Sequence, residues 1–329
     1  MKILIIGCGS IGQRHIRNLI FLKAGNILAF DIDKTKLGAV KKVNPFITVS
    51  DDLDSLWREK PDAVFVTVPT ALHMEYALRA ANRGCHVFLE KPLSHNTDGI
   101  NELIRIAAAK RLVIFVGYNL RFNKCLLKVK AILDKKAIGK IITARTHFGS
   151  YLPERHPWED YRRGYGAKKS LGGGVILDAL SHHLDLAIFL FGKAGELLGY
   201  SAKQSSLDID VEDTADALIK FRNGEFVDLH ANFVERPPRH TLEVVGDKGV
   251  LSCDFINNIV RHYDANAKKW AAYHGDKDPN KVYIKEIEHF LKCVKEQAKI
   301  PVDAKSAKKE LELLMKIKES NRRKRWVRV

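Results

Sequence analysis

The chain has 329 residues, of which 46% are hydrophobic and 29% charged, a composition typical of globular proteins with a packed core. Its length favours two domains. Lys and Arg number 55 against 39 Asp and Glu, which leaves a net charge of +16, but no nucleic-acid-binding motif accompanies this charge. We therefore expect no nucleic-acid partner, and a surface charge that either attracts anionic small molecules or keeps the protein in solution.

No apolar stretch reaches the roughly 18 residues that cross a bilayer, and glycines interrupt the apolar start of the chain, which differs from a signal peptide in this respect. The five cysteines are odd in number and have no metal-ligand spacing. Free thiols in a reducing compartment fit this pattern best. We expect a cytoplasmic protein without membrane contact and without a bound metal.

Strand-like and helix-like segments alternate through the first 120 residues. The strands are short apolar runs, as strands buried on both faces should be. Strands are expected at 3–6, 27–31, 47–49, 63–68, 86–90 and 113–117, and helices follow them, one ending near residue 21 and others at 72–83 and 98–110. This order predicts a doubly wound parallel sheet, the architecture of a Rossmann dinucleotide-binding domain, over residues 1–122.

The pattern changes after residue 123. A helix at 124–134 precedes a strand at 141–149, a loop at 151–170 and an apolar helix at 175–191. Apolar and polar residues then alternate, which indicates a sheet with one covered face. Six more strands are expected at 196–203, 213–221, 225–234, 240–246, 249–255 and 258–263, and helices at 281–298 and 303–323 close the chain. We predict an α+β domain with a largely antiparallel sheet over residues 123–329.

A glycine-rich turn follows the first strand and opens the first helix. Gly7, Gly9 and Gly12 form the spacing G-x-G-x-x-G. The first glycine permits a tight turn, the second lets a pyrophosphate approach the backbone, and the third allows close packing of helix on strand. The start of the helix, with Ser10 and Ile11, offers free N–H groups to the phosphates. The motif in this context predicts a dinucleotide site.

The residue that ends the second strand indicates which dinucleotide. Asp31 lies where the ribose of the cofactor arrives. Its carboxylate can accept hydrogen bonds from both ribose hydroxyls of NAD and would repel the 2′-phosphate of NADP. Lys34 is near enough in sequence to weaken that repulsion. We predict NAD as the cofactor, with NADP as the alternative.

Polar residues follow three further strands, at the edge where open α/β sheets bind ligands. The sequence Glu-Lys-Pro at 90–92 comes directly after an apolar strand, which aims the lysine at the nicotinamide region. The expected cofactor contacts are Val68, Pro69, His73, Glu90, Lys91 and Arg121, and the expected substrate contacts are Tyr118 and Asn119.

The apolar helix that follows a triple glycine carries a polar stripe. Asp178 and His182 are four residues apart, which places them on one face of a helix. Because such a stripe must line a site or face water, we predict catalytic roles for this pair. His183, offset by one position, and Asp185 are expected to be structural. A metal site is an alternative, but no third ligand has a clear spacing.

Taken together, the segments GCGSIG, VPTALH, EKP, GYNLRF and GGGVILDALSHHLD, with Asp31, resemble the glucose–fructose oxidoreductase and inositol dehydrogenase family, Gfo/Idh/MocA. The resemblance runs along nearly the whole chain. It implies that Lys91 matches the catalytic lysine of the family and that Asp178 and His182 match its Asp–His pair. It also implies a homodimer or homotetramer joined through the C-terminal sheet. One departure, Ala179–Leu180–Ser181 where many members have a glycine, is expected to alter packing and not chemistry.

The resemblance implies hydride transfer between the nicotinamide and a CH–OH or keto group of a sugar, cyclitol or nucleotide sugar. His182 would take the hydroxyl proton, since an unperturbed histidine titrates at about pH 6.5. Asp178 would support His182, and Lys91 would stabilise negative charge on the same oxygen. Two alternatives remain, an NAD-dependent glycosidase of the same family and a non-catalytic sensor that binds the cofactor.

The loop at 151–170 is expected to cover the site with Trp158, Tyr161 and Arg162. Basic residues are concentrated in this loop. Arginine binds phosphate and carboxylate groups in a planar, bidentate geometry. We therefore expect an anionic form of the sugar-like substrate.

Overall fold

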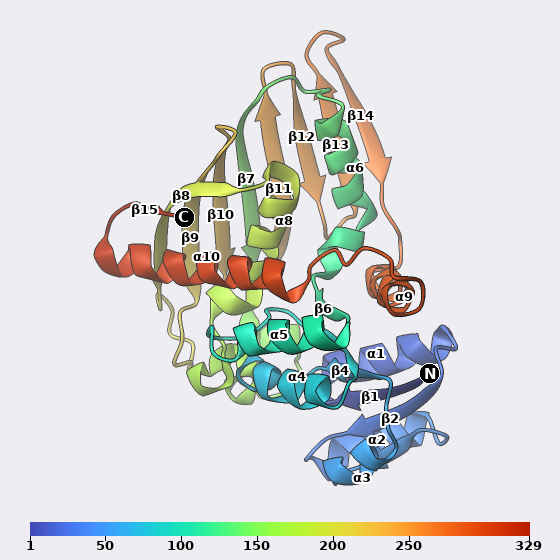
Figure 1. The fold of residues 1–329 in the computed structure, drawn as a ribbon. Coiled ribbons are helices and arrows are strands. Elements are labelled where there is room, and N and C mark those ends of the chain that lie inside the picture. Colours follow the sequence, from blue (N-terminus) through green and yellow to red (C-terminus); the bar gives the residue numbers. More distant parts are fainter. The chain divides into compact units, whose positions relative to one another are not determined.

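The structure is a computed structural model that describes residues 1–329. The chain forms two compact units (Figure 1). The first contains Met1–Tyr118 and Asn280–Lys309, and the second contains Asn119–Pro279 and Glu310–Val329. The domains predicted from the sequence, 1–122 and 123–329, assigned the segment 280–309 to the second domain, whereas this segment packs in the first unit.

Six parallel strands form the sheet of the first unit, in the order β3-β2-β1-β4-β5-β6, which is the order of a Rossmann fold. The strands are β1 (Lys2–Ile6), β2 (Asn26–Phe30), β3 (Thr48–Ser50), β4 (Ala63–Val66), β5 (His86–Glu90) and β6 (Ile114–Gly117). The helices are α1 (Ser10–Phe21), α2 (Lys34–Val43), α3 (Leu53–Arg58), α4 (His73–Asn82) and α5 (Ile100–Lys110). The predicted parallel architecture is confirmed.

The short helices α2 and α3 were not identified from the sequence. Each begins after an aspartate, Asp33 or Asp52, whose side chain accepts a hydrogen bond from a backbone N–H of the first turn. Such N-caps stabilise helix starts. Helix α3 has only six residues, and α2 buries only Leu37 and Val40, so apolar periodicity was weak in both and the caps were the clearest signal.

The segment that returns to the first unit covers a row of phenyl rings on the sheet. Phe65, Phe88 and Phe115 lie on three neighbouring strands, with ring centroids 4.6 Å and 5.3 Å apart. Phe290, on helix α9 (Lys281–Glu296), packs edge-on against all three. These four side chains are among the largest that are fully buried. Helix α9 therefore completes the core of the Rossmann unit.

The second unit is built on a nine-stranded sheet in the order β14-β13-β12-β11-β7-β10-β9-β8-β15. All neighbouring strands are antiparallel except β7 and β10. The strands are β7 (Ile141–Gly149), β8 (Ala194–Ala202), β9 (Thr214–Phe221), β10 (Phe226–Asn232), β11 (Arg239–Gly246), β12 (Gly249–Asp254), β13 (Ile259–Asp264), β14 (Lys269–His274) and β15 (Val327–Arg328). The predicted α+β unit is confirmed, and β14 and β15 are additions to it.

Helices α6 (Lys124–Asp134) and α8 (Ser181–Phe191) pack on one face of this sheet (Figure 1). Helix α10 (Ala304–Arg323) closes against β8, where Ser320 accepts a hydrogen bond from the Gly199 N–H. Along β10, Val227 and Leu229 are fully buried, while Asp228 and His230 point to the opposite face. The sheet therefore has one apolar, covered face and one polar face.

The apolar stretch before and within α8 has an irregular start. Residues Ile176–Leu180 form a turn of π-helix, and four-residue helix α7 (Leu152–Arg155) and three 3₁₀ turns replace the predicted loop at 151–170. The helical stretch Lys169–Phe191 is long and apolar enough to cross a membrane by composition, but 78% of its apolar window is buried inside the protein. Its burial is that of a core helix.

Candidate cofactor and catalytic residues

The glycine turn after β1 has open space at Gly9, whereas Gly7 and Gly12 are tightly packed. Gly7 has a φ of +100°, and a Cβ there would lie 2.8 Å from the Thr67 carbonyl oxygen. A Cβ on Gly12 would collide with the Gly7 carbonyl oxygen, whereas at Gly9 no atom lies within 4 Å. No side chain caps the start of α1. The N–H groups around Ser10 and Ile11 are therefore placed to bind a pyrophosphate, which fits a dinucleotide.

Asp31 follows β2 and is held beside this turn. Its Oδ2 accepts a hydrogen bond from the Cys8 N–H at 2.7 Å, and its Oδ1 accepts one from the Asp33 N–H at 2.9 Å. Burial, together with the Asp31 charge, raises the pKa of the Cys8 thiol to about 12. Cys8 is therefore a neutral filler, and Asp31 is fixed where the sequence placed the ribose-binding carboxylate.

His73 ties together the two loops that follow β4 and β5. Its two ring nitrogens lie 2.9 Å from the carbonyl oxygens of Val68 and Pro92. The ring is buried, and burial lowers the pKa of His73 below its usual value. The neutral ring has one N–H and donates to one of these two carbonyls, which holds the loops beside Pro69 and Lys91. The predicted contact of His73 with the cofactor stays a prediction.

Glu90 at the end of β5 also has a partner within the unit. Its Oε1 lies 2.7 Å from His15 Nε2, on helix α1. Burial alone would raise the pKa of Glu90, but the His15 hydrogen bond and the neighbouring positive charges lower it overall. Glu90 therefore anchors the strand end from which Lys91 projects.

In the second unit, Asp178 lies in the π-helical turn and is held by two side chains from the loop at 151–170. Arg155 Nη1 donates to Asp178 Oδ2 at 2.6 Å, and the Tyr165 hydroxyl donates to Oδ1. The guanidinium of Arg155 lies 4.5 Å from the ring centre of Phe233 and 5.1 Å from that of Phe148, and its Nε donates to Ser150. Asp178 is thus clamped by a cation that is itself packed between rings.

The triple glycine before this turn is filled by the protein's own chain. A Cβ on Gly173 would collide with the Tyr165 carbonyl oxygen, and one on Gly174 would lie 2.5 Å from Glu212 Oε1. The same Glu212 oxygen lies 3.4 Å from the Ile176 N–H that donates to it. The glycines therefore let the loop and Glu212 pack against the start of the helix that carries Asp178.

His182 and His183 differ in environment, as their positions on the helix predicted. His182 is partly exposed, whereas His183 is fully buried beside Phe148 and His240. Burial, with the neighbouring histidines, holds the pKa of His183 well below its usual value. His183 is therefore a neutral core residue. No group of three or more His, Cys, Asp or Glu side chains is arranged to hold a metal ion.

Arg121 was predicted to bind the cofactor, and in the structure it pairs with an acid of its own unit. Its Nη2 lies 2.6 Å from Asp185 Oδ1 and 3.5 Å from Glu310 Oε1. Asp185 is fully buried, and burial raises its pKa despite the opposing charge of Arg121. Asp185 therefore orients Arg121, and a cofactor role for Arg121 stays a prediction.

The residues expected to cover or line the site lie in different environments. Trp158 is 72% exposed, and Arg162 pairs with Asp160 at 2.8 Å. Tyr161 accepts a hydrogen bond from the Asp208 N–H through its hydroxyl. Tyr118 is buried in the first unit, and Asn119 begins the second. Their predicted contacts with substrate stay predictions.

Three side chains hold the segment around Asp178: sequence reasoning missed Tyr165 and Glu212, and it named Arg155 only as a basic residue of the loop expected to attract an anionic substrate. All three come from loops or from helical turns too short to show periodicity. The only available signal was the triple glycine itself, because three small residues in a row before a helix indicate that other groups pack closely there.

Comparisons with known proteins agree with this architecture. Residues 1–118 match the model of an oxidoreductase family with an NAD-binding Rossmann fold, and residues 126–252 match the GFO/IDH/MocA C-terminal domain. A myo-inositol 2-dehydrogenase from Thermotoga maritima is 26% identical and aligns with 100% of this chain and 98% of its own length. A UDP-N-acetylglucosamine 3-dehydrogenase from Acidithiobacillus ferrooxidans is 25% identical over 97% of this chain and 96% of its own.

The fold is also that of solved structures. A levoglucosan dehydrogenase in complex with NADH and levoglucosan superposes with a TM-score of 0.89 at 18% identity, over 100% of this chain and 99% of that one. At this identity the likeness shows the fold.

Proposed function

The chain belongs to the GFO/IDH/MocA family of NAD(P)-dependent oxidoreductases, and we propose that it oxidises or reduces one carbon of a sugar, cyclitol or nucleotide sugar. The observation that carries the proposal is the pairing of two features. One is an open, uncapped glycine turn that fits a dinucleotide, and the other is a clamped Asp178 four residues before a partly exposed histidine. The names of the two aligned relatives support the substrate class.

Bound NAD supplies the hydride acceptor at its nicotinamide ring. The first unit holds the cofactor at the turn Gly7–Gly12 and at Asp31. Its other contribution is Lys91, which we propose donates a hydrogen bond to the reacting oxygen of the substrate. His73 and Glu90 fix the two ends of the loop that presents Lys91.

In the oxidation direction, we propose that His182 takes the proton of the substrate hydroxyl as the carbon gives up its hydride, so that the alcohol becomes a ketone. Asp178 was expected to support His182. The contacts within its unit suggest a further role, because a carboxylate clamped by Arg155 and Tyr165 is a fixed acceptor for a second substrate hydroxyl. Such fixed acceptors orient polyols.

The test is a screen of neutral sugars, cyclitols, sugar acids and nucleotide sugars for formation or consumption of NADH. Turnover of at least one class, lost in Lys91→Ala and His182→Ala, is expected. NADH binding without turnover of any class would instead favour the non-catalytic sensor. A glycosidic bond cleaved with NAD present but not consumed would favour the glycosidase.

We also propose that the protein is a homodimer or homotetramer joined through the polar face of the nine-stranded sheet, and that it works in the cytoplasm. Tyr200 and Trp270, which are 46% and 58% exposed, support an interface. Their cross-strand partners Asp216 and Tyr263 point to this polar face. Light scattering of the wild type and of Trp270→Lys measures the assembly directly; a monomeric wild type would contradict the proposal.

A further inference from the structure

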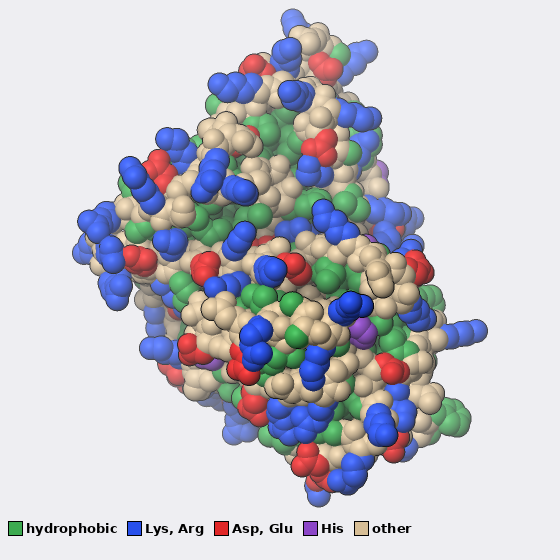
Figure 2. Space-filling model, viewed as in Figure 1, with side chains coloured by type: hydrophobic (Ala, Val, Ile, Leu, Met, Phe, Trp, Pro, Cys, Tyr) green, Lys and Arg blue, Asp and Glu red, His purple; other side chains and the backbone are tan.

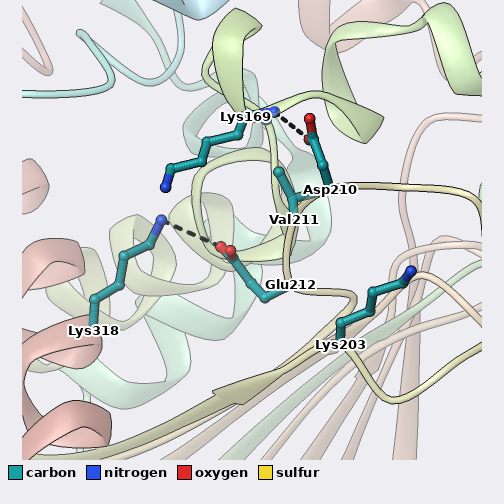
Figure 3. Close-up of a pocket in the computed structure, with 7 residues that line it drawn as sticks. Lys169, Lys203, Asp210, Val211, Glu212 and Lys318 are labelled. Atoms are coloured by element: carbon teal, nitrogen blue, oxygen red, sulfur yellow. Dashed lines mark hydrogen bonds and ion pairs between the residues drawn. The ribbon is translucent and has the colours of Figure 1, made fainter.

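A pocket of about 480 Å³ lies in the second unit, and Asp178 is not among the residues that line it (Figure 3). Three segments line it: the turn before α8, the end and loop after β8, and helix α10. The lining residues are Lys169, Gly173, Lys203, Asp210, Val211, Glu212 and Lys318. Its volume is within the usual range of small-molecule sites.

The pocket gathers three ammonium groups against two carboxylates. Lys318 Nζ lies 3.4 Å from Glu212 Oε1, while the ammonium groups of Lys169 and Lys203 make no ion pair. Figure 3 shows Lys169 and Lys318 extending toward one another, with Glu212 beside Lys318 and Lys203 pointing away. Two cations that approach each other without a shared anion repel, which favours an anion between them.

Both carboxylates are already committed to the backbone. Asp210 Oδ1 accepts the Lys169 N–H at 2.6 Å, and Glu212 accepts the Ile176 N–H at the start of the π-helical turn. The negative charges in the pocket are thus used to fix loops. An entering anion can therefore take Lys318 from Glu212 and leave the helix start still bonded to Glu212.

The surroundings add positive potential. Arg322 and Arg323 end the helix that carries Lys318, Lys324 and Arg325 follow it directly, and all four are exposed. Figure 2 shows Lys and Arg side chains gathered around that end of α10. Asn321 anchors this end by donating to the Ser201 carbonyl oxygen at 2.8 Å. The pocket lining has one more cation than carboxylates, and the basic residues beyond it add to this excess, which raises the local concentration of anions.

We propose that this pocket binds a phosphate group, held by Lys169 and Lys318 with Lys203 at its rim. Lysine binds phosphate as a flexible point charge and needs no planar geometry, unlike the arginine predicted from the loop. The phosphate belongs either to the substrate, as in a nucleotide sugar, or to a separate small molecule. The first case rests on the proposed function, and the second does not.

The pocket is also connected to the reaction centre through the chain. Glu212 contacts Gly174, and the Gly174 carbonyl oxygen accepts the Asp178 N–H at 2.9 Å. A phosphate that draws Lys318 away from Glu212 is therefore linked to Asp178 through Glu212 and Gly174. Binding in the pocket is expected to alter the kinetics even where the phosphate is not part of the substrate.

The binding test uses inorganic pyrophosphate and calorimetry on the full chain, at constant ionic strength set with chloride. We expect saturable binding that weakens by about tenfold or more in Lys169→Ser/Lys318→Ser, since charge-assisted bonds are lost.

The control variant is Lys292→Ser/Lys295→Ser, which removes the same number of positive charges from exposed positions of α9. The single change Lys169→Gln is a second variant, which removes one cation, adds no acid beside the Lys318–Glu212 pair and should also weaken binding. Equal affinity in wild type and pocket variants, or no saturable binding, overturns the proposal.

Because calorimetry needs no turnover, failure of this proposal is separable from failure of the proposed enzyme. A kinetic arm then identifies the source of the phosphate. If the pocket variants lose kcat/KM only for a phosphate-bearing substrate, and pyrophosphate competes with it, the phosphate is the substrate's own. If pyrophosphate changes kcat for a neutral sugar without competing, a separate small molecule binds there.

Discussion

Two glycine turns precede helices in this protein, one in each unit, and they serve opposite purposes. At the turn before α1, the position of a Cβ on Gly9 is empty and no side chain caps the helix. At the turn before α8, the corresponding space beside Gly173 and Gly174 is filled by Tyr165 and Glu212. The same residue type therefore makes room for a ligand in one unit and for the protein's own loop in the other.

The comparison teaches that a glycine run by itself does not indicate a binding site. What separates the two cases is the state of the helix N-terminus. An uncapped start with open space offers N–H groups to an anion, whereas at the second start the Val175 and Ile176 N–H groups already donate to Glu212. The first turn is therefore open to a ligand, whereas the second fixes the segment that carries Asp178.

The largest expected effect separates binding from chemistry. We expect Lys91→Ala and His182→Ala each to lower kcat by at least about 100-fold, the usual scale of lost acid–base or electrostatic help. NADH affinity, measured by fluorescence titration, should change little. An unchanged kcat in either variant would show that this residue takes no part in the chemical step.

One glycine substitution in each turn should have opposite effects on NADH affinity and on stability. Gly9→Val puts a side chain into open space, so NADH affinity should fall about tenfold or more while the free energy of unfolding changes by only about 0.5 kcal/mol. Gly173→Ala forces the Tyr165 backbone to move, which should cost about 1–3 kcal/mol and lower kcat, with NADH affinity retained. The opposite pattern would show that the turns have been assigned wrongly.

Arg155 provides a test of positioning. Arg155→Gln removes the cation that clamps Asp178, and we expect kcat to fall about tenfold, as is typical when an orienting partner is lost. Arg155→Lys keeps the charge but loses the ring stacking, so it should recover part of kcat. The pH profile of kcat is the decisive readout, because a residue that serves stability alone would leave the profile unshifted.

A smaller effect is expected at Asp31, which concerns the first turn only. Asp31→Ala removes the repulsion of a 2′-phosphate, and the ratio of NADPH to NADH affinity should rise about tenfold. Thr214→Ala, in the second unit, is a matched control with no expected change in this ratio. Tighter binding of NADPH by the wild type would contradict the preference for NAD.

The smallest effect lies outside both turns, on the polar face of the sheet. His230 Nδ1 is 2.6 Å from Asp216, and this hydrogen bond, against the effect of burial, raises the pKa of His230. The pair therefore stabilises the fold below about pH 6.5, and this contribution is lost as the pH rises through the raised pKa. Asp216→Asn should lower Tm more at about pH 6 than at about pH 9. A Tm difference that does not change with pH would contradict this.

The sequence predicted the regular helices and strands better than the irregular turns. The helix at 124–134 and the strand at 141–149 were placed to the residue, because charged residues bound the helix and glycines flank or end the strand. The spacing of Asp178 and His182 was interpreted as α-helical, whereas Ile176–Leu180 is a π-helical turn. A single wide turn leaves no trace in apolar periodicity, although such turns are frequent at functional sites.

The clamp on Asp178 and the return of α9 were beyond sequence reasoning for another reason. Arg155 lies 23 residues before Asp178, at the end of a four-residue helix too short to be recognised in the sequence. The sequence does not indicate which of the acidic residues forms the ion pair with Arg155. Phe290 has the ordinary pattern of an amphipathic helix, which shows that the helix is packed but not on which unit it packs.

That return of the chain has a consequence for synthesis on the ribosome. The row of Phe65, Phe88 and Phe115 emerges early, but Phe290 that covers it is made only after the entire second sheet. For most of translation the nascent Rossmann sheet carries an aromatic stripe that only His15 of α1 partly covers. Exposed apolar surface of this kind is bound by chaperones and aggregates in their absence. A fragment cut at residue 122 would keep that stripe permanently exposed.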